Sequence, residues 1–117
     1  MRVLIAEDSE SVRFALRLVV EYFGHEVVGQ TDDGNRVLDL YRRIHPELVL
    51  MDVQMPGMDG LTCTALLSAI DPLAKVVIVT AGRTTEREAR EAGATGFVEK
   101  PFDLREIGRL LASAAAA

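Results

Sequence analysis

The sequence predicts an α/β domain in which a parallel β-sheet is wound on both sides by helices. Five short apolar runs have the length of strands, and three of them are nearly continuous in apolar residues, as in strands covered on both faces. Segments with apolar residues at helical spacing lie between these runs. Because strand and helix alternate, right-handed crossovers and a doubly wound sheet are expected. The 117 residues match one domain, so we expect a single domain over residues 1–117.

The predicted strands are runs of mainly aliphatic and β-branched residues. The first, third and fourth runs carry no polar residue at all, which indicates strands covered on both faces, as in a parallel sheet. The five predicted strands are Val3–Ala6, Glu26–Val28, Leu48–Met51, Val76–Val79 and Gly96–Val98.

Three predicted helices follow the first three strands. The first is indicated by apolar residues at a spacing of three and four, with Ser9 as its N-cap and Gly24 at its end. Shorter helices are expected over residues 35–44 and 61–68, and Asp59 is placed to cap the second of these.

The last two helices have recognisable starting residues. Thr85 and Glu88 form a capping-box pattern that opens a helix to about Ala92, and Asp103 is the expected N-cap of the last helix. The alanine-rich end at residues 112–117 predicts a frayed continuation of that helix, with the start of a linker as the alternative.

Composition excludes several classes of protein. The net charge of −5 argues against direct nucleic-acid binding by bulk charge. The single cysteine, Cys63, forms no internal disulfide, and no Cys/His group has the spacing of zinc ligands. The sequence carries no signal-peptide pattern and no apolar run long enough to span a membrane. We therefore expect a soluble, cytoplasmic domain without membrane partners.

Polar residues gather where the predicted strands end. Glu7 and Asp8 follow the first strand, Asp52 the third, Thr80 the fourth and Lys100 the fifth. Ligands of open parallel sheets bind outside the carboxyl ends of the strands, so these side chains are expected to converge at one edge. Neighbouring carboxylates repel one another unless cations intervene, and Mg²⁺ is typically held by one or two carboxylates. A carboxylate nucleophile, a cation, a lysine and a hydroxyl together indicate phosphoryl transfer.

Four motifs stand in order along the chain: VLIAED at residues 3–8, LVLMDVQMPGMDG at residues 48–60, VVIVTA at residues 76–81 and FVEKPF at residues 97–102. With these motifs at these spacings, the chain closely resembles the receiver domain of bacterial two-component response regulators. The resemblance covers essentially the whole chain and implies a flavodoxin-like (βα)₅ sheet with strand order 2-1-3-4-5.

The resemblance also implies roles for individual residues. Asp52 is expected to accept a phosphoryl group from a sensor histidine kinase or phosphotransfer protein. Asp8, Asp52 and the backbone carbonyl of Gln54 are expected to bind Mg²⁺, with Glu7 acting mainly through water. Lys100 is expected to pair with Asp52 and then with the phosphoryl group.

Two further residues are expected to form the switch. Thr80 would move to bond the phosphoryl group, and Phe97 would rotate inward with it. A cis peptide bond is expected before Pro101. The family implies a signalling switch rather than an enzyme, acting on a downstream protein target or output domain.

This sequence departs from the family pattern at a few positions. Glu7 stands where aspartate is commoner, Phe97 lacks a tyrosine hydroxyl, and Gln54 and Gly82 occupy positions that tune the lifetime of the phosphate in this family. A haloacid-dehalogenase-like phosphatase is disfavoured because such enzymes need a second Asp where Gln54 stands.

Two alternatives remain open from the sequence. One is a pseudo-receiver, an interaction module that is never phosphorylated. The other concerns organisation, since the chain fits both a stand-alone receiver and the receiver part of a longer regulator, with a stand-alone receiver preferred.

Overall fold

A computed structural model of the chain describes residues 1–116. Five parallel strands form one sheet in the order β2-β1-β3-β4-β5, which confirms the predicted fold class and strand order. The strands are β1 (Arg2–Ala6), β2 (Glu26–Thr31), β3 (Leu48–Met51), β4 (Val76–Thr80) and β5 (Gly96–Glu99).

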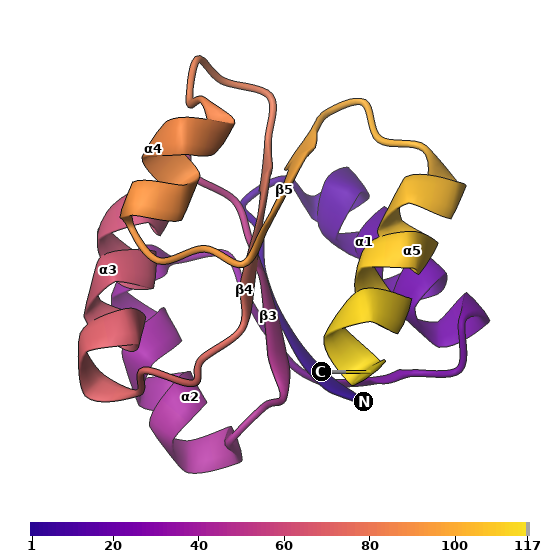
Figure 1. Cartoon of the computed structure of the whole chain (residues 1–117), viewed down its shortest axis with the longest axis horizontal. Helices are drawn as coiled ribbons and strands as arrows, with labels where there is room; N and C mark the ends of the chain where they lie inside the picture. Colours follow the sequence, from indigo (N-terminus) through magenta and orange to yellow (C-terminus); the bar gives the residue numbers. More distant parts are fainter. Residues whose placement is uncertain (117) are drawn as a thin grey trace.

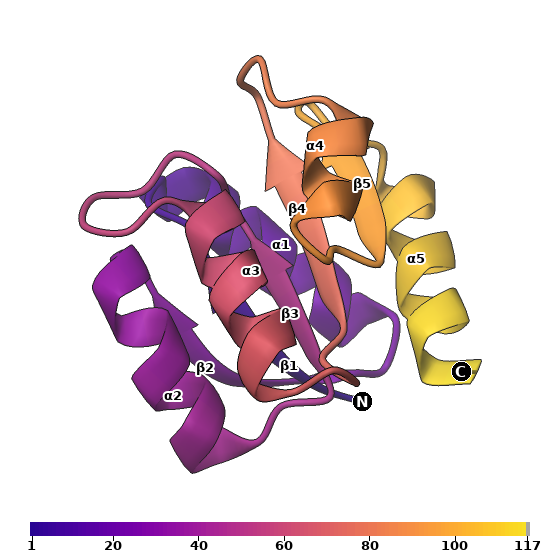
Figure 2. The same cartoon turned by 60° about the vertical axis from the view of Figure 1, so that its left-hand side comes forward.

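Helices cover both faces of the sheet. The helices are α1 (Glu10–Tyr22), a 3₁₀ turn η1 (Gly34–Arg36), α2 (Val37–Ile44), α3 (Gly60–Ile70), α4 (Glu86–Glu91) and α5 (Leu104–Ala116). Helices α2, α3 and α4 lie on one side of the sheet, and α1 and α5 lie on the other (Figures 1 and 2). Among the described residues, no helix is both long and apolar enough to cross a membrane.

The two faces of the sheet bury separate apolar clusters. Along β1, Leu4 packs with the α2–α3–α4 side and Ile5 with the α1–α5 side, because successive side chains of a strand point to opposite faces. This two-sided burial explains why β3 and β4 read as unbroken apolar runs. Cys63 is buried in the first cluster, where burial and the nearby Asp59 and Asp33 carboxylates raise the pKa of its thiol to about 11.

The predicted helix caps are confirmed. The side chains of Ser9 and Asp59 accept hydrogen bonds from the backbone N–H groups of Val12 and Thr62, and Thr85 forms the capping box with Glu88. Asp103 accepts a hydrogen bond from the N–H of Arg105 at the start of α5. That helix continues to Ala116, so the alanine-rich end is helical as far as the structure describes it.

Several boundaries differ from the prediction by one to three residues, and those of β2 and α2 have a clear cause. Strand β2 runs to Thr31 rather than Val28, because β1 pairs with it along its whole length, beyond the apolar residues that marked it in the sequence. The helix expected from Asn35 is a 3₁₀ turn until Val37, since the Asp33 side chain caps the N–H of Asn35. Both differences arise from backbone pairing and side-chain capping that apolar periodicity does not record.

A partly buried hydrogen bond between Tyr41 of α2 and Asp71, just after α3, predicts a pH effect on stability. The Tyr41 hydroxyl donates to Asp71 Oδ2 at 2.7 Å, and burial and then the Asp71 carboxylate raise the pKa of Tyr41 to about 12 from 10.0. The folded state thus favours the neutral phenol. The resulting stabilisation should be complete below pH 10 and should be lost as pH rises through 12.

Ultraviolet titration of phenolate absorbance measures the raised pKa of Tyr41. The chain has two tyrosines, and the other one, Tyr22, is exposed, so the two phenols can be told apart. Tyr41→Phe should remove the phenol that titrates at the higher pH. It should also reduce the decrease in unfolding free energy between pH 10 and pH 12. An unchanged titration curve after this substitution would contradict the role of the hydrogen bond.

Candidate functional site

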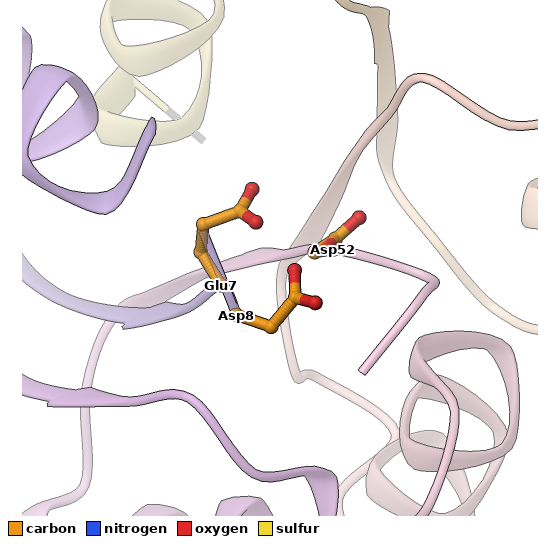
Figure 3. A group of neighbouring side chains, drawn as sticks. All are labelled: Glu7, Asp8 and Asp52. Carbon is orange, nitrogen blue, oxygen red and sulfur yellow. The ribbon is translucent and has the colours of Figure 1, made fainter. Parts of the chain in front are cut away.

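The register of the sheet brings the acidic residues together. Ala6 of β1 lies beside Met51 of β3, so the next residues along these strands, Glu7 and Asp52, leave the sheet side by side. The N–H of Asp52 donates to the carbonyl of Ala6 at 2.8 Å, which extends the pairing by one residue. Figure 3 shows the carboxylates of Glu7, Asp8 and Asp52 gathered at this edge.

The three carboxylates have the composition of a site for a hard divalent cation. One carboxylate oxygen from each of Glu7, Asp8 and Asp52 lies within 4.8 Å of the others. Glu7 and Asp52 are buried, whereas Asp8 is exposed, so a cation bound here would keep contact with water. Oxygen donors with open positions for water fit Mg²⁺, which usually keeps several of its waters.

Repulsion and burial perturb these carboxylates. Burial, followed by the neighbouring carboxylates of Asp8 and Glu7, raises the pKa of Asp52 to about 7, and the charge of Lys100 opposes this rise. Burial also acts to raise the pKa of Asp8, but its contacts with Asp52 and Glu7 and the charge of Lys100 lower that pKa below its ordinary value. Without a cation, Asp52 therefore takes up a proton before Asp8 does as the pH is lowered.

Lys100 reaches this cluster from the end of β5. Its backbone N–H donates to the carbonyl of Thr80 at 2.9 Å, and the bond between Lys100 and Pro101 is cis, as expected. The Lys100 ammonium forms ion pairs with two carboxylates: Nζ lies 2.6 Å from Glu7 Oε1 and 3.5 Å from Asp52 Oδ1. The sequence predicted the pair with Asp52 but not the closer pair with Glu7.

The remaining predicted residues lie in or just after β3, β4 and β5. Thr80 is buried at the end of β4, and its hydroxyl oxygen accepts a hydrogen bond from the N–H of Gly82 at 3.1 Å. Gln54 is exposed, and its side-chain amide lies beside Gly82. Phe97 is half-buried against the apolar cluster on the α4 side of the sheet. The switch roles of Thr80 and Phe97 and the metal role of the Gln54 carbonyl stay predictions.

Two further groups support the site and were not predicted. The backbone N–H of Ser9 donates to Glu7 Oε2 at 3.0 Å, and Arg13 Nη1 donates to the Glu7 carbonyl at 2.8 Å. Ser9 was identified only as a helix cap. No motif in the sequence marks Arg13, because its contact depends on the path of the chain between β1 and α1.

The loop after Asp52 returns closely over its own backbone, which yields a prediction for Gly60. A Cβ atom at Gly60 would collide with the backbone carbonyl of Asp52, whereas one at Gly82 would meet the flexible end of Gln54 at 3.0 Å. Gly60→Ala should lower the free energy of unfolding by about 1–3 kcal/mol through overpacking. Urea denaturation would show this, with Gly82→Ala as the matched control near the same site. Equal stability of the two variants would contradict the close approach.

The fold and this site define a class, the flavodoxin-like α/β domains with an acidic pocket and a lysine at the carboxyl ends of their strands. The sequence model of one family of this class, the response regulator receiver domain, matches residues 3–112. The chain belongs to the response regulator receiver domain family.

Individual relatives agree with this assignment. The chemotaxis protein CheY of Thermotoga maritima is 35% identical over 103 residues, which are 86% of this chain and 86% of the relative. The response regulator GacA of Pseudomonas aeruginosa is 39% identical over 110 residues, which are 92% of this chain but 51% of the relative. This chain therefore spans most of one relative and about half of the other.

A solved structure shows the same fold. The crystal structure of the CheX–CheY–BeF₃–Mg²⁺ complex from Borrelia burgdorferi contains a chain that matches with a TM-score of 0.92 and 25% identity, over 98% of this chain and 89% of that one.

Proposed function

We propose that this receiver domain is a phosphorylation-driven signalling switch whose phosphoryl acceptor is Asp52. The observation that carries the proposal is the meeting of three carboxylates and the Lys100 ammonium at one edge of the sheet. An Asp52 oxygen attacks the phosphorus atom of a phosphohistidine in a sensor histidine kinase or phosphotransfer protein. The bond from phosphorus to the imidazole nitrogen breaks, and the imidazole leaves with the electron pair.

The residues of the pocket fit Mg²⁺, and we assign its ligands to Asp8, Asp52 and the backbone carbonyl of Gln54. When bound, Mg²⁺ would neutralise charge on the transferring phosphoryl group and hold Asp52 deprotonated. The Lys100 ammonium stabilises the same oxygens from the β5 side. The CheX–CheY complex from Borrelia burgdorferi contains BeF₃ and Mg²⁺, which supports the choice of Mg²⁺ as the cation.

The new charge at Asp52 is read out through Thr80 and Phe97. The Thr80 hydroxyl would leave the Gly82 N–H for a phosphoryl oxygen, and the half-buried ring of Phe97 would follow into the space that opens. The altered surface includes α4, β5 and α5, which would bind a downstream protein target or an output domain. We place the domain in the cytoplasm, where such partners occur.

A pseudo-receiver that is never phosphorylated is the competing proposal, and one measurement separates the two. Intact-mass spectrometry after incubation with acetyl phosphate should show a gain of one phosphoryl group in Mg²⁺ and none after EDTA. Phosphoramidate serves as a second small donor. No gain with either donor in Mg²⁺ would favour the pseudo-receiver and overturn the switch.

A further inference from the structure

Lys100 and Glu7 form the shortest ion pair at the site, although the lysine was expected to pair with Asp52. The distance from Lys100 Nζ is 2.6 Å to Glu7 Oε1 and 3.5 Å to Asp52 Oδ1. The shorter separation makes the ion pair with Glu7 the stronger of the two, because the attraction between opposite charges weakens with distance. Of its two carboxylate neighbours, the ammonium is therefore held mainly by Glu7.

Glu7 is itself held in place at three points. Its backbone N–H donates to the carbonyl of Thr31 at 3.0 Å, its carbonyl accepts from Arg13, and its Oε2 accepts the N–H of Ser9. The Glu7 carboxylate cannot follow the lysine without losing the Ser9 bond. It is thus a fixed anchor, and Lys100 is the partner that adapts.

Burial makes this contact necessary for Glu7. The residue is 0% exposed, and within the described part of the chain its Oε1 has no hydrogen-bond partner, so its contact with a positive charge is the ion pair with Lys100. A buried charge without a partner is strongly destabilising, so Lys100 supplies the compensation that Glu7 needs. An ammonium has three donors, which lets Lys100 keep Glu7 while it presents another proton towards Asp52.

We infer that Glu7 is a positioning residue, which anchors the Lys100 ammonium beside Asp52 and leaves the oxygens of Asp8 and Asp52 free for a cation. The one additional methylene of glutamate, compared with aspartate, lets its carboxylate reach the lysine. The inference rests on the proposed function, since Lys100 is the cation that we assign to the phosphoryl group. It changes the expected role of Glu7 from water-mediated metal binding to control of the lysine.

The chain offers a direct spectroscopic test, because Lys75 and Lys100 are its two lysines. Protein labelled with ¹³C-lysine should give two sets of side-chain Cε–Hε signals, which Lys75→Arg assigns. Lys75 donates to the carbonyl of Ala114, at the far end of the sheet, and is an internal reference. Neither Mg²⁺ nor phosphorylation is needed, so failure of the phosphorylation assay would leave this test intact.

Glu7→Gln and Asp52→Asn are matched variants, since each replaces one carboxylate of the cluster by an amide of the same shape. We expect Glu7→Gln to shift the Lys100 signals and to loosen the side chain in ¹³C relaxation, and Asp52→Asn to change both far less. Glu7→Asp, which keeps the charge but shortens the side chain, should act in the same direction as Glu7→Gln. Asp8→Asn removes a nearby charge without removing an ion pair of Lys100, so it measures how far the loss of charge alone shifts the Lys100 signals.

The ranking of the variants decides the outcome. A larger effect from Asp52→Asn, or equal effects from both, would show that Asp52 holds the lysine and would overturn the inference. An unchanged Lys100 signal in Glu7→Asp would also overturn it, because the reach of the glutamate would then be irrelevant. The Lys75 signals should stay constant throughout, which confirms that each variant is folded.

Discussion

Asp52→Asn should abolish phosphoryl uptake from acetyl phosphate in Mg²⁺. The amide oxygen of asparagine is a far weaker nucleophile than a carboxylate, and it brings no negative charge to the cation. Glu7 is anchored by Ser9 and Lys100, so it is poorly placed to act as a substitute acceptor. We expect the mass gain of the wild-type protein to disappear completely in this variant.

Asp59→Asn is the matched control for that experiment. Asp59 lies in the same loop and caps α3, outside the carboxylate cluster, and asparagine is an equally good N-cap. This control should take up one phosphoryl group as the wild type does. Labelling of Asp52→Asn to the wild-type level would move the acceptor to another residue, which peptide mapping would then locate.

Asp52→Asn should also stabilise the metal-free fold. Asp52 is 4% exposed among two other carboxylates, and its pKa of about 7 lies above the ordinary 3.8. Such a gap is worth at most about 4 kcal/mol, and because Asp52 titrates together with Asp8 we expect about half of it. Asp52→Asn should therefore raise the free energy of unfolding by about 2 kcal/mol above pH 7.

The pH dependence gives this prediction its sign. A pKa that is raised in the folded state means that folding favours the protonated carboxyl. The corresponding stability is present below pH 3.8 and is lost as pH rises through about 7. The advantage of Asp52→Asn over the wild type should thus shrink as the pH is lowered from 8 to 5, because Asp52 then becomes neutral.

Urea denaturation in EDTA and in Mg²⁺ measures both effects. Mg²⁺ should stabilise the wild type and the Asp59→Asn control, since a ligand that binds only the folded state adds to its stability. It should stabilise Asp52→Asn much less. If Asp52→Asn were less stable than the wild type at pH 8 in EDTA, the ion pair between Lys100 and Asp52 would outweigh the cost of burying the carboxylate.

Much of the fold was predictable because its determinants are local. Unbroken apolar runs identified the central strands, and Ser9, Asp59 and Thr85 marked helix starts through bonds to residues three positions away. The end of β2 was missed because pairing with β1 extends it through Gly29 and Gln30, which carry no apolar side chain. The strand order was inferred from the family resemblance and is confirmed by the structure.

The sequence alone indicated that Glu7, Asp8, Asp52 and Lys100 would meet, since each comes just after the end of a parallel strand, and the structure brings these four together. It did not determine how they pair. Which of the two carboxylates Lys100 contacts more closely depends on side-chain reach at the ends of β1, β3 and β5, and on the bonds from Ser9 and Arg13 that fix Glu7. Differences of about 1 Å decide such pairings, because the attraction between charges weakens with distance, and only the packed chain sets those distances.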